Sequence, residues 1–122
     1  MPADPAPVLL SSVVNRAVDV VDPAGDHEGV AEVFARFEDA DEPITAVPDV
    51  GRRVAEAVGR LDPDEEDGPL QMVWAVATYL AYRRDEIDDA RDDLLRLAAR
   101  AEWKGDPPDV VRDWLLMEGV EV

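Results

Sequence analysis

The chain of 122 residues carries 29 acidic and 12 basic side chains, a formal net charge of −17 and no cysteine. Its length suits one domain with its own core, and an apolar fraction of 47% argues against disorder along the whole chain. Without cysteine the chain can form no disulfide and has no thiolate nucleophile. No run of about 18 apolar residues is present, so the sequence predicts no membrane span.

Three stretches in the first half of the chain have the apolar spacing of helices. Residues 1–7 contain three prolines and are expected to form a disordered leader, followed by a single helical domain over 8–122. Apolar residues recur every three to four positions over 8–21, 26–39 and 50–61, which indicates three amphipathic helices. The expected core residues of the second and third helices are Val30, Val33, Phe34, Phe37, Val50, Val54, Ala57, Val58 and Leu61.

The second half of the chain contains the most apolar stretch, 70–82, which is predicted to be the central helix because it is apolar nearly all round. A helical stripe continues through 83–103, and the pattern leaves open whether the two stretches form one helix or two. The residues expected to face inward there are Ile87, Ala90, Leu94, Leu97, Ala98 and Ala101. Asp106 and Pro107 predict the start of a last helix that ends at Gly119. With short loops and no evident internal repeat, these elements predict an all-α, compact bundle of five or six helices.

The acidic residues are spread along the chain, and Lys104 is the only lysine. In dilute buffer so much like charge opposes compaction, whereas at 1 M salt the Debye length falls to about 3 Å and the repulsion is screened. This balance resembles that of proteins from salt-in halophiles such as haloarchaea, and the resemblance implies a high-salt cytoplasm. The alternative is a nucleic-acid mimic or a partner for a basic protein, but even spreading of the acids favours the halophile interpretation.

Residues 44–58 resemble the helix-hairpin-helix motif of DNA-binding and repair proteins. Val47, Pro48, Val50, Gly51 and Ala55 stand in the register of that motif, while Asp49 replaces its first glycine. The resemblance implies a DNA phosphate held by backbone N–H groups near Gly51, with Arg52 and Arg53 as further contacts. The alternative is that Asp49 simply caps a helix that begins at Val50.

Asp88, Asp89 and Asp92 form an Asp-Asp-x-x-Asp pattern on a predicted helix. The pattern resembles the aspartate-rich motif of helical isoprenoid synthases, which implies Mg²⁺ bound by carboxylate oxygens. The neighbouring apolar stripe places these aspartates on the solvent side, so the alternative is a solvated helix face. The single histidine, His27, stands beside no nucleophile motif and is expected to be a surface residue near a helix start.

The inventory of residues contains no recognisable catalytic constellation and implies no cofactor. The leading hypothesis is therefore a non-catalytic protein-interaction or homo-oligomerisation module, with no membrane partner. Trp103, between a glutamate and a lysine, is the expected partner contact. DNA binding through Gly51, Arg52 and Arg53, and a small Mg²⁺ enzyme at Asp88, Asp89 and Asp92, remain as alternatives.

Overall fold

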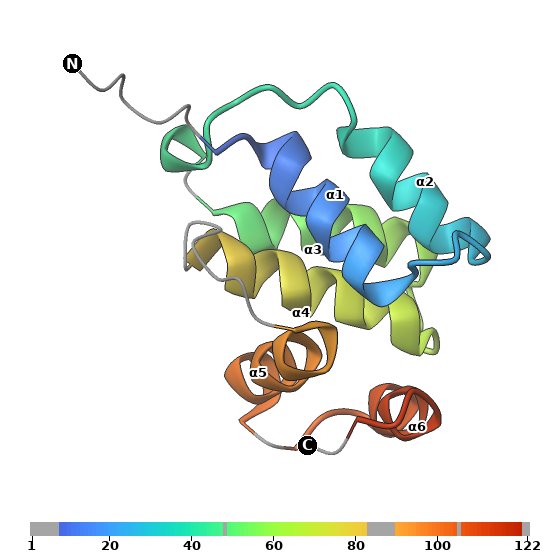
Figure 1. The fold of residues 1–122 in the computed structure, drawn as a ribbon. Helices are drawn as coiled ribbons and strands as arrows, with labels where there is room; N and C mark the ends of the chain where they lie inside the picture. The colour runs from blue at the N-terminus through green and yellow to red at the C-terminus, as the bar shows by residue number, and fades with distance from the viewer. Residues whose placement is uncertain (1–7, 48, 83–89, 105, 121–122) are drawn as a thin grey trace.

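A computed structural model describes residues 8–47, 49–82, 90–104 and 106–120, which form a bundle of α-helices (Figure 1). The helices are α1 (Leu10–Val21), α2 (Glu28–Phe37), α3 (Val50–Leu61), α4 (Gly68–Tyr82), α5 (Arg91–Trp103) and α6 (Asp109–Met117), with a short 3₁₀ turn, η1, at Ile44–Ala46. Within the described ranges β-structure is limited to an isolated bridge between Leu9 and Pro43. The prediction of an all-α bundle of five or six helices is confirmed. No helix in these ranges is long and apolar enough to cross a membrane.

Helix α4 is the centre of the bundle, as its apolar composition predicts. It packs against α1 and α3 on one side and against α5 and α6 on the other (Figure 1). Its buried residues point in all directions around the helix axis: Leu70, Gln71, Met72, Val73, Ala75, Val76, Ala77 and Leu80. Burying so much apolar surface is the main force that gathers the other helices around α4.

The stretch after α4 forms a separate helix whose buried face agrees with the predicted one only at Leu94 and Ala98. Residue 90 is in an extended conformation before α5, so α4 and α5 are not one continuous helix. The buried residues of α5 are Leu94, Leu95, Ala98 and Ala99, whereas Ala90 and Ala101 are exposed. The Nε of Arg91 donates to the carbonyl of Val20 at 2.6 Å, which joins the first turn of α5 to the end of α1. The predicted inward position Ile87 lies outside the described residues.

Two helices begin later than predicted. Helix α2 is capped by the side chain of His27 rather than by Asp26. Helix α6 begins at Asp109 after Pro108, and the expected cap Asp106 instead pairs through its carboxylate with Arg112 at 2.9 Å. At the start of α6 the carboxylate of Asp106 thus has an arginine as its partner, whereas at the start of α2 the cap is shifted by one residue to His27.

The structure also shows an internal repeat, which the apolar pattern of the sequence does not predict. Helices α1 and α3 have the same length, and the residues that cap the following helices, His27 and Asp67, are 40 positions apart. The same offset separates pairs of identical residues: Val14 and Val54, Ala17 and Ala57, Val18 and Val58, Asp22 and Asp62, Pro23 and Pro63. The α1–α2 hairpin and the start of the α3–α4 hairpin are therefore two versions of one structure.

The two turns of this repeat are built in the same way. In each, an aspartate side chain accepts hydrogen bonds from the backbone N–H groups four and five residues later, at 3.2 and 3.0 Å for Asp22 and at 3.0 and 2.8 Å for Asp62. The third residue after each aspartate has positive φ, 72° at Gly25 and 55° at Glu65. The aspartate thus replaces the backbone acceptors that the turn lacks and directs the chain into the next helix.

Candidate functional site

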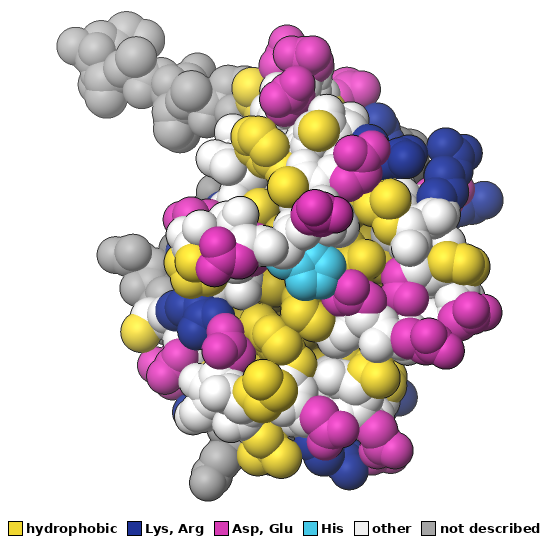
Figure 2. All heavy atoms as spheres, turned by 90° about the vertical axis from the view of Figure 1, so that its right-hand side faces the viewer, with side chains coloured by type: hydrophobic (Ala, Val, Ile, Leu, Met, Phe, Trp, Pro, Cys, Tyr) yellow, Lys and Arg dark blue, Asp and Glu magenta, His cyan; other side chains and the backbone are white. Residues whose placement is uncertain are grey.

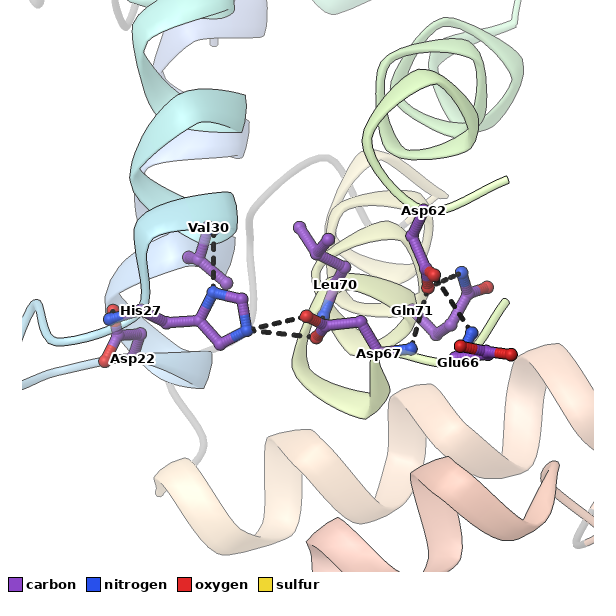
Figure 3. Close-up of polar contacts among 8 residues, drawn as sticks. All are labelled: Asp22, His27, Val30, Asp62, Glu66, Asp67, Leu70 and Gln71. Carbon is purple, nitrogen blue, oxygen red and sulfur yellow. Dashed lines mark hydrogen bonds and ion pairs between the residues drawn. The ribbon is translucent and has the colours of Figure 1, made fainter. Parts of the chain in front are cut away.

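The capping residues of the two repeated turns meet each other. The Nε2 atom of His27 lies 3.0 and 2.8 Å from the two carboxylate oxygens of Asp67, so the start of α2 is joined to the start of α4 (Figure 3). Both side chains are about one-third exposed, at 30% and 31%. The sequence places His27 at a helix start, which is confirmed, but it does not reveal Asp67 as its partner.

Each residue of this bridge also caps its own helix, which fixes the roles of the histidine nitrogens. The backbone N–H of Val30 donates to Nδ1 of His27 at 3.2 Å, and the N–H of Leu70 donates to the Asp67 carboxylate at 3.0 Å. Because Nδ1 accepts a hydrogen bond, the neutral ring carries its proton on Nε2 and donates it to Asp67. Both ring nitrogens therefore have partners within the fold, and the pair joins the starts of two helices.

Next to the bridge, Asp62 is buried, and its carboxylate accepts three hydrogen bonds. Besides its two backbone hydrogen bonds it accepts one from Nε2 of Gln71 at 3.2 Å (Figure 3). Burial raises the pKa of the Asp62 carboxyl, but the hydrogen bonds from Asp67, Glu66 and Gln71 outweigh burial and leave that pKa below its ordinary value. Asp62 is therefore an ionised carboxylate held inside the turn.

A hollow of about 370 Å³ lies beside His27, on the face where α1, α2, α4 and α6 meet (Figure 2). Its walls include Pro69 and Trp114, and two of its acidic side chains are already bonded: Asp22 within the turn and Glu118 to Arg91 at 2.8 Å. Among the described residues no group of three or more histidine, aspartate or glutamate side chains is placed to hold a metal ion. Two of the three acidic side chains that line the hollow thus have partners within the fold, and the third, Asp26, is exposed.

The residues of the predicted helix-hairpin-helix have other partners. Asp49 caps α3 by accepting the N–H of Arg52 at 3.0 Å, which confirms the predicted cap. A Cβ at Gly51 would lie 2.9 Å from Oγ1 of Thr78, so glycine is needed there for close packing of α3 on α4. The guanidinium groups of Arg52 and Arg53 lie 3.5 and 3.4 Å from glutamate carboxylates. The segment before Asp49 contains the short turn η1, and Pro48 lies outside the described residues.

The predicted aspartate-rich motif falls mostly outside the described residues. Asp88 and Asp89 belong to the range that the structure leaves undescribed, and Asp92 is exposed in the first turn of α5. Asp92 lies 3.9 Å from the guanidinium of Arg91, which is a long ion pair on the surface. The described part of the chain therefore offers a single carboxylate of the three.

Trp103, the predicted partner contact, is half-buried at the end of α5. Its ring packs edge-on against Trp74 of α4, with centroids 6.1 Å apart and an interplanar angle of 84°. Such pairs stabilise the contact between two helices beyond their buried area. The exposed aromatic residue at this end of the molecule is instead Tyr82, the last residue of α4, whose side chain is 80% exposed.

Tyr82 forms part of the rim of a second pocket, between the C-terminal halves of α4 and α5. This α4–α5 pocket has a volume of about 310 Å³, and its lining residues are Ala75, Thr78, Tyr79, Tyr82, Ala101 and Glu102. Glu102 is half-buried there, and burial raises the pKa of its carboxyl above the ordinary value. Sequence reasoning did not identify Glu102, because one glutamate among 29 acidic residues carries no distinguishing signal.

Comparisons of the chain with protein-family models, with curated proteins and with solved structures found no match.

Proposed function

We propose that this chain is a non-catalytic protein-interaction module and that the α4–α5 pocket is its binding surface. The observation that carries the proposal is Tyr82, a large aromatic side chain that stands 80% exposed at the rim of a pocket with mainly apolar walls. Tyrosine is enriched in protein interfaces because it supplies a large contact area at low cost in conformational entropy. Exposing it beside a pocket has no evident benefit for the folded monomer.

The state of His27 supports a non-catalytic role. It is the one histidine of the chain, and both of its ring nitrogens take part in helix capping and in the bridge to Asp67. A general base must be able to reach a proton on the substrate, and His27 would have to break its capping bond to do so.

The setting that we propose is a cytoplasm of concentrated salt. The net charge of −17 and the single lysine support it, since a carboxylate surface keeps a protein hydrated when ions screen its self-repulsion. Circular dichroism during a titration with KCl tests this proposal. We expect helical signal and unfolding temperature to rise toward molar KCl, and a fold equally stable in dilute buffer would contradict it.

Size-exclusion chromatography with light scattering in molar KCl, combined with pull-down from an extract of the source cells, tests the interaction module. We expect the chain to retain a partner or a second copy, and Tyr82→Ala to lose it. Met117→Ala is the matched control, because Met117 is equally exposed, at 83%, but lies on α6 away from the pocket. A strict monomer that retains no partner, or equal binding by both variants, would contradict the proposal.

DNA binding through Arg52 and Arg53 and Mg²⁺ binding at Asp88, Asp89 and Asp92 remain hypotheses with simple tests. Filter binding at low and high salt, with Arg52→Ala/Arg53→Ala as the variant, tests the first. Titration of Mg²⁺ while amide signals of residues 85–93 are observed tests the second, and unmoved signals would end it.

A further inference from the structure

We infer that the α4–α5 pocket receives a lysine or arginine side chain from a basic segment of another protein, with Glu102 as the counter-charge. The inference rests on the proposed function and adds the chemistry of the partner to it. Three features of the pocket lead to it: the unpaired carboxylate of Glu102, the two tyrosines beside it, and the charge of the molecule around it.

Glu102 differs from the other acidic side chains that line cavities in this fold, because it is half-buried without a partner among the described residues, whereas Asp19 and Asp26, which line other cavities, are exposed. Within the described ranges, Asp22, Asp62 and Glu118 each accept hydrogen bonds, whereas Glu102 forms no hydrogen bond or ion pair. Burial raises the pKa of its carboxyl, and among the residues that the structure describes no cation pairs with it. A carboxylate that is partly removed from water and left without a partner favours a ligand that brings a positive charge.

The walls of the pocket fit the rest of a basic side chain. Tyr79 and Tyr82 lie on successive turns of α4, and Ala75 and Ala101 complete an apolar surface around a volume of about 310 Å³. Lysine and arginine have long apolar stems that pack on such walls while their charged ends reach a polar group. Tyrosine rings add an attraction for a cation that lies near their faces.

The charge of the whole molecule distinguishes between kinds of partner. A second copy carries 29 acidic but only 12 basic side chains and so offers few cations to Glu102, whereas a basic segment offers many. In molar salt the Debye length of about 3 Å is close to the length of a direct ion pair, so long-range attraction is lost while a half-buried contact persists. The pocket therefore supplies local recognition of a cation in conditions that screen the surface.

The test uses the full chain, labelled with ¹⁵N, in molar KCl and two synthetic helical peptides of alanine and leucine. One peptide has a central lysine and the other has norleucine, of similar shape but uncharged, at the same position. We expect the lysine peptide to shift the amide signals of the pocket residues and to bind about tenfold more tightly than the norleucine peptide. Glu102→Gln should abolish this difference, and Glu38→Gln, which removes an exposed charge on α2, should keep it.

The outcomes separate this inference from the proposed function. Equal binding of both peptides at the pocket, weakened by Tyr82→Ala, would contradict the cation site and still support an interaction module. No shift of the pocket signals by either peptide, up to about 1 mM, would contradict both. If light scattering shows a dimer, and the amide signals of Tyr82 and Glu102 lie in its interface, then the occupant of the pocket is a second copy of the chain and not a basic segment. Unchanged signals outside the pocket show that each variant is folded.

Discussion

Gly68 and Val110 bring the backbones of α4 and α6 into direct contact. A Cβ atom at position 68 would lie 2.4 Å from the carbonyl oxygen of Val110, closer than any real contact allows. We expect Gly68→Ala to lower the free energy of unfolding by about 1–3 kcal/mol, because α6 must move away. Gly59→Ala is the control, since nothing lies within 4 Å of its Cβ and alanine favours the helix by about 0.5–1 kcal/mol. Urea unfolding in molar KCl measures both, and a stable Gly68→Ala would show that the two helices are not held this closely.

The His27–Asp67 bridge can be separated from the two helix caps by a double-mutant cycle. Asparagine at either position keeps an oxygen that can cap the helix but removes the ionic part of the bridge. Because both side chains are about one-third exposed, we expect a coupling free energy of only about 0.5–1 kcal/mol. Alanine at either position should lower the free energy of unfolding by about 1 kcal/mol more than asparagine does, because the helix cap is lost. Additive effects of the two asparagine variants would mean that the bridge contributes nothing to stability.

Asp62 makes stability depend on acid pH. Its folded-state pKa is lower than that of the unfolded chain, so its contribution is complete above the unfolded value and is lost as the pH falls through the folded value. We expect Asp62→Asn to be less stable than wild type at neutral pH and to lose less stability on acidification. Thermal unfolding between neutral and acid pH measures this. Asp64→Asn, exposed in the same turn, should keep the wild-type acid dependence, and identical curves for the two variants would contradict the assignment.

The repeat predicts a stabilising substitution. Gly25 and Glu65 occupy the same place in the two turns, both with positive φ, and only glycine adopts this conformation without strain. We expect Glu65→Gly to raise the free energy of unfolding by about 0.5–1 kcal/mol and Gly25→Ala to lower it by about 1 kcal/mol. Chemical denaturation of the pair checks the signs, and the same sign for both would mean that the turns are not equivalent.

Gly51 can be tested for a packing role independently of nucleic acid. The Cβ of Gly51→Ala would press against the side chain of Thr78, so we expect the free energy of unfolding to fall by about 1 kcal/mol. Thr78→Ala in the same chain removes the side-chain atoms that the new Cβ would meet, and it should recover part of the lost stability. Thermal unfolding of the two single variants and the double variant decides it. A loss that Thr78→Ala does not reduce would point to another reason for glycine at this position.

Most of the fold follows from hydrophobic periodicity, and the places where prediction went wrong have physical reasons. The core of α3 and the central position of α4 were predicted, because one face or the whole surface of each helix is apolar. The buried face of α5 was predicted only in part, at Leu94 and Ala98, since the leucines and alanines of this stretch fit more than one register. The contact of Arg91 with Val20 joins α5 to α1, and no local pattern reveals it.

Less of the candidate site than of the fold could be predicted from the sequence. The bridge between His27 and Asp67 joins residues 40 positions apart and depends on how two hairpins pack. Trp103 was predicted as a partner contact because it stands between charged residues, yet it is half-buried and packs against Trp74, and the exposed aromatic residue is Tyr82. Periodicity shows which residues are buried together, whereas a site depends on the few that remain accessible next to them.

The pairing of His27 with Asp67 sets a limit on how alike the two hairpins can become. The positions are equivalent, and each lies at the positive end of a helix. Aspartate at both would place two negative charges at neighbouring helix starts and would be too short to bridge them. Histidine at both, each capping its own helix through Nδ1, would turn two N–H donors toward each other with no acceptor between them. The two similar turns therefore carry different caps, and the difference between histidine and aspartate is what allows the caps to pair with each other.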